Sequence, residues 1–206
     1  MNFLVIEGNI GAGKTTLAQI LAERLEAHLV LEKFADNPFL PAFYQNPDRF
    51  AFSLEMFFLA ERYHQLHREV AQAQLFHPWT IADFAFERSA VFASVTLKDH
   101  ELEVFQRVFS FLKPHVPHPT HFIWLEESVS GLMLSILKRG RPFELLITED
   151  YLRKIDEQYK AWLCTVSHVK SFITVSRAET DFVKFPELAD KLVDWLREGR
   201  SGFFVP

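Results

Sequence analysis

The chain has 206 residues, with 22 Lys or Arg against 27 Asp or Glu, so its formal net charge is −5. That length suits one domain with a continuous core, and a net negative chain without clusters of basic residues argues against binding DNA or RNA. The single cysteine, Cys164, excludes an intrachain disulfide, and its apolar neighbours predict a buried, unreactive thiol. No apolar stretch approaches the ~20 residues that span a bilayer. Without a basic signal segment at the N-terminus, we expect a cytoplasmic protein.

The pattern of apolar residues predicts short strands that alternate with helices. The predicted strands cover residues 3–6, 28–31, 79–82, 121–125 and 171–175. The predicted helices cover residues 14–28, 50–75, 90–112, 129–138, 148–166 and 186–197, and three prolines within 36–47 predict an irregular turn with room for one short helix. Such alternation is typical of βαβ units. We therefore predict one α/β domain over residues 1–206, a five-stranded parallel sheet with helices on both faces.

A nucleotide-binding motif lies between the first predicted strand and the first predicted helix. Residues 8–15 read Gly-Asn-Ile-Gly-Ala-Gly-Lys-Thr and match G-x-x-x-x-G-K-[ST] in full, which indicates a P-loop NTPase-type sheet. Glycines allow a tight turn whose N–H groups face a phosphate, and the helix that follows adds its positive end. We predict that ATP and Mg²⁺ bind here, through Gly8, Asn9, Ile10, Gly11, Ala12, Gly13, Lys14, Thr15 and Thr16.

The rest of the chain indicates which class of phosphate-loop protein this is. A GTPase needs an N/T-K-x-D segment after a strand to read guanine, and the sequence contains none. Asp83 follows the third predicted strand, where a carboxylate would support Mg²⁺ beside Thr15. The residues after it, 84–88, do not resemble an ATPase switch. These observations favour a kinase that acts on a small molecule.

Several segments resemble the deoxynucleoside kinase family, in particular the bacterial deoxyadenosine/deoxyguanosine kinases. The likeness covers nearly the whole chain and includes residues 7–16, Asn-Pro-Phe-Leu at 37–40, and Lys-Arg-Gly-Arg-Pro-Phe-Glu at 138–144. The loop alone occurs in many classes of nucleotide-binding protein, but its combination with the other two segments is much more specific to this family. The resemblance implies transfer of the ATP γ-phosphate to the 5′-hydroxyl of a small-molecule deoxynucleoside. Family members are commonly dimers, so it also implies a homodimer.

The resemblance assigns chemical roles to side chains both inside and outside the loop. Glu32, at the carboxyl end of the second strand, would accept the proton of the attacking hydroxyl. Lys14, with Arg139 and Arg141 from a mobile lid, would neutralise charge on the migrating phosphoryl group. The remaining assignments are Thr15 and Asp83 to the metal, Tyr44 and Glu144 to the sugar 3′-hydroxyl, and Arg62 to the base or a neighbouring carboxylate.

Four positions depart from the family pattern. Glu55 stands where the family has a glutamine that hydrogen-bonds the base, and an ionised carboxylate, which only accepts, would suit guanine. Burial would raise the pKa of Glu55 and restore a donor, so a purine is favoured, deoxyguanosine or deoxyadenosine. Phe84, counted here among the substrate-side residues, replaces an arginine whose role would pass to Arg88. The other two are Ser89, in place of an aspartate, and Ser135, in place of a lid arginine.

Two other functions remain open from the sequence. A nucleoside-monophosphate kinase of the thymidylate kinase type needs cations for an acceptor phosphate, and Lys33, Arg49 and Arg62 could supply them. A nucleotide-binding regulatory protein with reduced catalysis would explain the departures from the family pattern. The presence of Lys14, Thr15, Glu32 and Asp83 argues against a protein that has lost catalysis.

Overall fold

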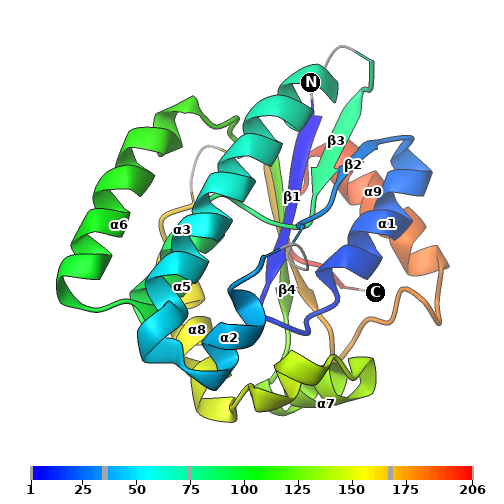
Figure 1. Ribbon diagram of the computed structural model, residues 1–206. Helices are drawn as coiled ribbons and strands as arrows, with labels where there is room; N and C mark the ends of the chain where they lie inside the picture. The colour runs from blue at the N-terminus through cyan, green and yellow to red at the C-terminus, as the bar shows by residue number, and fades with distance from the viewer. Residues whose placement is uncertain (1, 34–36, 74–75, 167–168, 206) are drawn as a thin grey trace.

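A six-stranded parallel sheet forms the centre of the molecule (Figure 1). The structure is a computed structural model that describes residues 2–33, 37–73, 76–166 and 169–205. The sheet order is β2-β3-β1-β4-β5-β6, and each neighbouring pair is parallel. The strands are β1 (Asn2–Gly8), β2 (His28–Val30), β3 (Trp79–Ala82), β4 (His121–Glu126), β5 (Ser171–Ser176) and β6 (Gly202–Phe203).

The prediction of five strands was wrong by one. β6 pairs Gly202 and Phe203 with Ile173 and Thr174 at one edge of the sheet. Its two residues are too few to show the alternation by which a strand is recognised in sequence. The other five strands lie where they were predicted, within one or two residues.

Helices cover both faces of the sheet, as predicted. Residues of β1 alternate between the two sides, with Leu4 and Ile6 in one core and Phe3 and Val5 in the other. The first core is covered by α1 (Lys14–Leu25) and α9 (Glu187–Glu198), and the second by α3 (Pro47–Gln65), α5 (Arg88–Thr96), α6 (Asp99–Leu112) and α8 (Glu149–Leu163). None of the helices in the described ranges is long and apolar enough to cross a membrane.

Two short helices lie below the carboxyl ends of the strands in Figure 1. They are α2 (Leu40–Gln45), within the predicted irregular turn, and α7 (Val129–Arg139), which ends at Gly140 in the left-handed conformation. The 3₁₀ segment η4 (Pro142–Leu146) continues from α7 and contacts α2. Residue 36, where the predicted turn begins, lies outside the described residues. These elements form the walls of the cavity described below.

Two long predicted helices are interrupted. The helix predicted over 50–75 is α3 followed by a π-helical turn (Leu66–Val70) and α4 (Ala71–Ala73), and residues 74–75 lie outside the described part. The helix predicted over 90–112 breaks at Leu97 and Lys98 into α5 and α6. Leu97 is buried and extended there, and Asp99 has a positive φ of 45°. Packing of Leu97 imposes this turn. Because no glycine or proline lies there, nothing in the sequence indicated the break.

The prediction of a buried cysteine was also wrong. Cys164 is exposed just beyond the end of α8, where its thiol contacts the Lys160 carbonyl. Its neighbours Trp162 and Leu163 are themselves only partly buried. The apolar run therefore marks the last turn of a surface helix rather than a core segment.

Candidate active site

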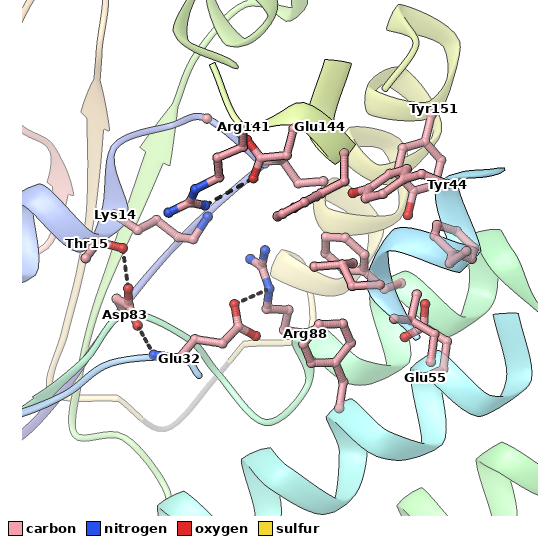
Figure 2. Close-up of a pocket in the computed structure, with 18 of the residues that line it drawn as sticks. Lys14, Thr15, Glu32, Tyr44, Glu55, Asp83, Arg88, Arg141, Glu144 and Tyr151 are labelled. Atoms are coloured by element: carbon pink, nitrogen blue, oxygen red, sulfur yellow. Dashed lines mark hydrogen bonds and ion pairs between the residues drawn. The ribbon is translucent and has the colours of Figure 1, made fainter. Parts of the chain in front are cut away.

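The largest group of predicted site residues lines one cavity at the carboxyl ends of the strands (Figure 2). Lys14, Thr15 and Asp83 lie at one end, which we call the loop end. Tyr44, Glu55 and Tyr151 lie at the opposite end, which also contains Phe43 and Phe143 and which we call the aromatic end. Glu32 and Arg88 lie between the two ends.

The conformation and packing of the loop backbone require glycine at two positions. Gly13 caps α1 with a φ of 89° in the left-handed region. Gly11 has the same φ, and a Cβ added there would lie 2.9 Å from the Leu132 carbonyl oxygen of α7. Asn9 is buried and donates from Nδ2 to the Leu152 carbonyl oxygen of α8 at 2.9 Å. The loop is therefore held between two helices with its N–H groups at the positive end of α1.

Lys14 is a buried cation that lacks a carboxylate within salt-bridge distance in the described ranges. Its Nζ donates to the carbonyl oxygens of Gly8 and Asn9, each at 2.9 Å. Burial, assisted by the charge of Arg88, lowers the pKa of Lys14 to about 7. A nucleotide phosphate would supply the missing negative charge, so this lysine fits the phosphate-binding role.

Thr15, Asp83 and Glu32 form a chain of hydrogen bonds across the loop end. Thr15 Oγ1 donates to Asp83 Oδ2 at 2.5 Å, and the backbone N–H of Glu32 donates to Asp83 Oδ1 at 2.8 Å. Burial raises the pKa of Asp83. The described residues contain no group of three or more acidic, His or Cys side chains able to hold a metal alone. The Thr15 hydroxyl and Asp83 carboxylate fit Mg²⁺ that takes its other ligands from nucleotide phosphates and water.

Glu32 lies between two buried arginines. Its Oε1 accepts from Arg62 Nε at 2.7 Å, and its Oε2 lies 3.5 Å from Arg88 Nε. Burial alone would raise the pKa of Glu32, but the two guanidinium groups outweigh that effect and lower the pKa to about 2. Glu32 is therefore ionised throughout the physiological pH range, with a carboxylate oxygen lining the cavity.

Arg88 joins the cavity to the buried start of the loop. Its Nη1 lies 3.2 Å from Glu7 Oε2 and donates to the Tyr159 hydroxyl at 2.8 Å. The Tyr159 hydroxyl in turn donates to Glu7 Oε2 at 2.9 Å, and the N–H of Ala85 donates to Glu7 Oε1 at 2.8 Å. Glu7 is fully buried, so this cluster is a charged centre inside the core. The sequence offered Arg88 only as a substitute cation and gave no sign of its pairing with Glu7.

Aromatic rings and the carboxyl group of Glu55 form the wall at the aromatic end of the cavity. The Tyr44 and Phe143 rings stack with centroids 6.2 Å apart. Glu55, from α3, is buried and accepts from Thr96 Oγ1 at 2.9 Å. Burial raises the pKa of Glu55 to about 7. A flat, largely apolar wall with few polar groups is typical of a site that takes a ring-shaped ligand.

The two predicted lid arginines converge on Glu144. Arg139 Nη2 lies 2.6 Å from Glu144 Oε2, and Arg141 Nη1 lies 3.1 Å from Glu144 Oε1. Glu144 is buried, whereas both arginine side chains are about one-third exposed. In this arrangement Glu144 holds the segment that carries both arginines against the cavity.

Several other predicted positions lie outside the cavity wall, among them the loop residues Gly8, Asn9, Ala12 and Gly13. Phe84 is fully buried in the core beneath α3 and α5. Ser89 is buried and accepts from Arg62 Nη1 at 2.9 Å, while Ser135 is exposed on α7. Thr16 lies in a neighbouring hollow with Gly13 and Arg177. The wall residues to which the sequence assigned no role are apolar or aromatic. Two of them, Leu40 and Phe143, lie in segments that carry the family resemblance, but an apolar side chain gives no sign of a chemical role. The full set is Leu40, Phe43, Leu54, Phe58, Phe92, Phe143 and Tyr151.

Fold and site together define a phosphate-loop kinase: a central parallel strand ends in the loop, and two strand-end carboxylates line the same cavity. Residues 4–198 match the family model described as deoxynucleoside kinase. A deoxyguanosine kinase of Bacillus subtilis is 36% identical over 183 residues, which are 89% of this chain and 88% of that protein. The chain belongs to the deoxynucleoside kinase family, and it is a phosphotransferase that acts on deoxynucleosides.

Other relatives extend the comparison. A deoxyguanosine kinase of Lactobacillus acidophilus is 28% identical and aligns with 96% of this chain and 92% of its own. A solved structure of deoxyadenosine kinase from M. mycoides superposes with a TM-score of 0.78 over 93% of this chain and 98% of that chain, at 22% identity. At that identity the structural likeness supports the fold. The predicted family and the α/β architecture are thus confirmed.

Proposed function

We propose that the protein transfers the γ-phosphate of Mg²⁺-bound ATP to the 5′-hydroxyl of a purine deoxynucleoside, with deoxyguanosine preferred. The observation that carries the proposal is the position of ionised Glu32, between the loop end and the aromatic end of one cavity. A nucleoside whose base lies at the aromatic end would direct its sugar toward the loop. A Bacillus subtilis relative named deoxyguanosine kinase is 36% identical, whereas one named deoxyadenosine/deoxycytidine kinase is 28% identical, and this difference supports guanine as the preferred base.

The residues present account for the chemistry of phosphoryl transfer. When bound, Mg²⁺-ATP supplies the phosphoryl group and a cation that draws charge from it. Glu32 accepts a hydrogen bond from the 5′-hydroxyl and takes its proton as the new P–O bond forms. Arg62 and Arg88 fix the orientation of this carboxylate. Lys14 exchanges its loop carbonyl partners for phosphate oxygens and neutralises their charge.

Lid movement would bring further positive charge to the phosphates. Arg139 and Arg141 are held by Glu144 within the wall of the same cavity. Glu144, with Tyr44, is also the proposed contact of the sugar 3′-hydroxyl. A bound sugar would therefore compete for the Glu144 carboxylate and release the arginines toward the loop end. Sugar binding and charge neutralisation would in this way be coupled.

The contacts of the candidate cations weigh against the monophosphate kinase alternative. Arg62 is engaged by Glu32 and Ser89, and Lys33 pairs with Glu69 at 3.4 Å. The third candidate, Arg49, is exposed, with its Cζ 5.3 Å from the centroid of the Phe50 ring, and it does not line the cavity. Each of the three cations is thus either paired with a carboxylate or outside the cavity wall. The complete loop-end geometry likewise argues against a regulatory protein that has lost catalysis.

We infer further that the protein is a cytoplasmic homodimer. Family resemblance supports the dimer, and exposed Phe111 at the end of α6 offers apolar surface to a second copy. Light scattering from the purified protein tests this inference, since a mass equal to one chain at micromolar concentration would contradict it.

The proposed function is tested by ADP release from ATP and Mg²⁺ with each of the four deoxynucleosides and their monophosphates. We expect turnover of the purine deoxynucleosides, and a loss of about 10²–10⁴-fold for Glu32→Gln because the proton acceptor is removed. Glu32→Gln is preferred to Glu32→Ala since it keeps side-chain volume beside Arg62. Glu101→Gln, at an exposed position of α6, is the matched control and should retain activity. Turnover of monophosphates alone would overturn the acceptor assignment.

A further inference from the structure

Glu55 is a buried carboxyl group that retains unused hydrogen-bonding capacity toward the cavity. It is 1% exposed and lines the aromatic end, opposite Lys14 and Thr15 (Figure 2). Its Oε1 accepts from Thr96 Oγ1, but its Oε2 has no hydrogen-bond partner among the described residues. A buried polar atom without a partner is costly, so its presence in a ligand cavity indicates that a ligand supplies the partner.

The two protonation forms of a carboxyl group pair with different purine edges. A carboxylate only accepts hydrogen bonds, whereas a carboxylic acid both donates and accepts. Adenine presents an acceptor at N1 beside a donor at N6, so it needs the acid form. Guanine presents donors at N1 and N2, which suit the carboxylate, and an acceptor at O6 beside N1–H, which suits the acid. Guanine can therefore pair with either form, and adenine with only one.

The charges around Glu55 leave it able to change form near neutral pH. Burial is the main cause that raises the pKa of Glu55 to about 7, and Glu32 raises it further. Arg62 on α3 and Arg88 on α5 oppose this shift, as does the hydrogen bond from Thr96. Two tyrosines also face this end of the cavity, Tyr44 on α2 and Tyr151 on α8, and the charge of Glu55 helps to raise the pKa of each.

These neighbours keep one charge state while Glu55 titrates. Glu32 is ionised, because its pKa is lowered to about 2, and both arginines remain charged. Burial raises the pKa of Tyr44 and of Tyr151, so both tyrosines stay neutral. Among the groups that surround it, Glu55 is thus the one that changes charge near pH 7.

We propose that the protonation state of Glu55 decides which purine deoxynucleoside the enzyme accepts. The protonated form accepts both deoxyadenosine and deoxyguanosine, and the ionised form accepts deoxyguanosine alone. Acidification would then broaden the substrate range, and alkaline conditions would narrow it to guanine. This inference rests on the proposed function, because it assumes that the base lies at the aromatic end.

The test is the ratio of kcat/KM for deoxyadenosine to kcat/KM for deoxyguanosine, measured across pH. The pKa of Lys14 is also about 7, but this lysine lies at the loop end, where it acts on both substrates alike, so its effect cancels in the ratio. At a pKa of about 7, the protonated fraction of Glu55 falls from ~90% at pH 6 to ~10% at pH 8. We expect the ratio to fall about tenfold over that interval.

Three variants identify the group responsible. Glu55→Gln cannot ionise and always offers a donor, so its ratio should be high and independent of pH. Thr96→Val removes the hydrogen bond that favours the ionised form, so the fall in the ratio should move to higher pH. Glu101→Gln makes the same charge change at an exposed site and should reproduce the wild-type curve.

The outcomes separate this inference from the proposed function. A ratio that stays flat in the wild type, or a fall that persists in Glu55→Gln, would overturn the role of Glu55 while leaving the kinase assignment intact. Failure to phosphorylate either purine deoxynucleoside at any pH would instead overturn the proposed function. Deoxyinosine, which lacks the N2 donor, serves as a third substrate. It should follow deoxyguanosine rather than deoxyadenosine, because it keeps the N1–H and O6 groups.

Discussion

The two ends of the cavity are built in different ways. The loop end comes from one continuous segment and two strand ends, and its fit to a phosphate depends on backbone N–H groups and glycine conformation. The aromatic end is assembled from α2, α3, η4 and α8, which are distant in sequence and meet through side-chain packing. Backbone geometry tolerates few substitutions, whereas packed side chains can be exchanged. We therefore expect changes at the loop end to alter the rate for every substrate, and changes at the aromatic end to alter which substrate is chosen.

Arg88 connects the two ends, and its replacement should have the largest effect on stability. In Arg88→Met the fully buried Glu7 carboxylate loses its cationic partner. Removing one member of a buried ion pair costs about 3–5 kcal/mol, so urea unfolding should show a loss of that size. Arg24→Met is the control, since its partner Asp190 is exposed and such pairs contribute ~0.2–1 kcal/mol. Equal losses in the two variants would show that the Glu7 cluster carries no special weight.

Lys14 tests the claim that the loop end serves all substrates alike. Lys14→Met keeps the apolar part of the side chain but removes the charge that would face the phosphates. Loss of one electrostatic contact to a transition state commonly lowers kcat by about 10²–10³-fold. The fall should be the same for deoxyguanosine and deoxyadenosine in steady-state assays. A changed preference between them would contradict the division of the cavity into two independent ends.

We expect the burial of Glu55 at the aromatic end to make the stability of the protein depend on pH. Folding raises the pKa of Glu55 from 4.5 to about 7, so between these values the folded chain keeps a proton that the unfolded chain has released. The free energy of unfolding therefore falls as pH rises through this window. The rise in this pKa, about 2.5, corresponds to a loss of ~3 kcal/mol in the free energy of unfolding.

Glu55→Gln does not titrate, so it should gain stability over the wild type by up to that amount at pH 8 and show little gain at pH 4.5. Thermal or urea unfolding of both proteins at the two pH values measures the difference. A gain of equal size at both values would mean that altered packing, and not ionisation, is responsible.

The sequence predicted the loop end better than the aromatic end, for a physical reason. A phosphate loop needs fixed glycines and a lysine at fixed spacing, so residues 8–15 can be read directly. Glu32 and Asp83 were found because parallel strands end at one edge of the sheet. The pairing of Arg88 with Glu7 and Tyr159 depends on packing between segments far apart in the chain. No local pattern records such a contact.

The errors at the fold level have the same origin. Phe84 was placed at the substrate by its neighbour Asp83, yet the chain turns there and buries the ring in the core. Cys164 was judged by apolar neighbours that belong to a surface turn. The break between α5 and α6 follows from burial of Leu97. In each case tertiary packing overrode the local signal.

The position of β1 in the sheet has a consequence for how the chain folds. This apolar strand carries the loop, yet its two neighbours, β3 and β4, come much later in the sequence. Parallel pairing over such distances is slow, and an unpaired apolar strand is prone to intermolecular association. Refolding from denaturant should therefore be slow and lose yield as protein concentration rises. The nucleotide-binding loop would be among the last parts to acquire its final shape, although it begins within the first ten residues.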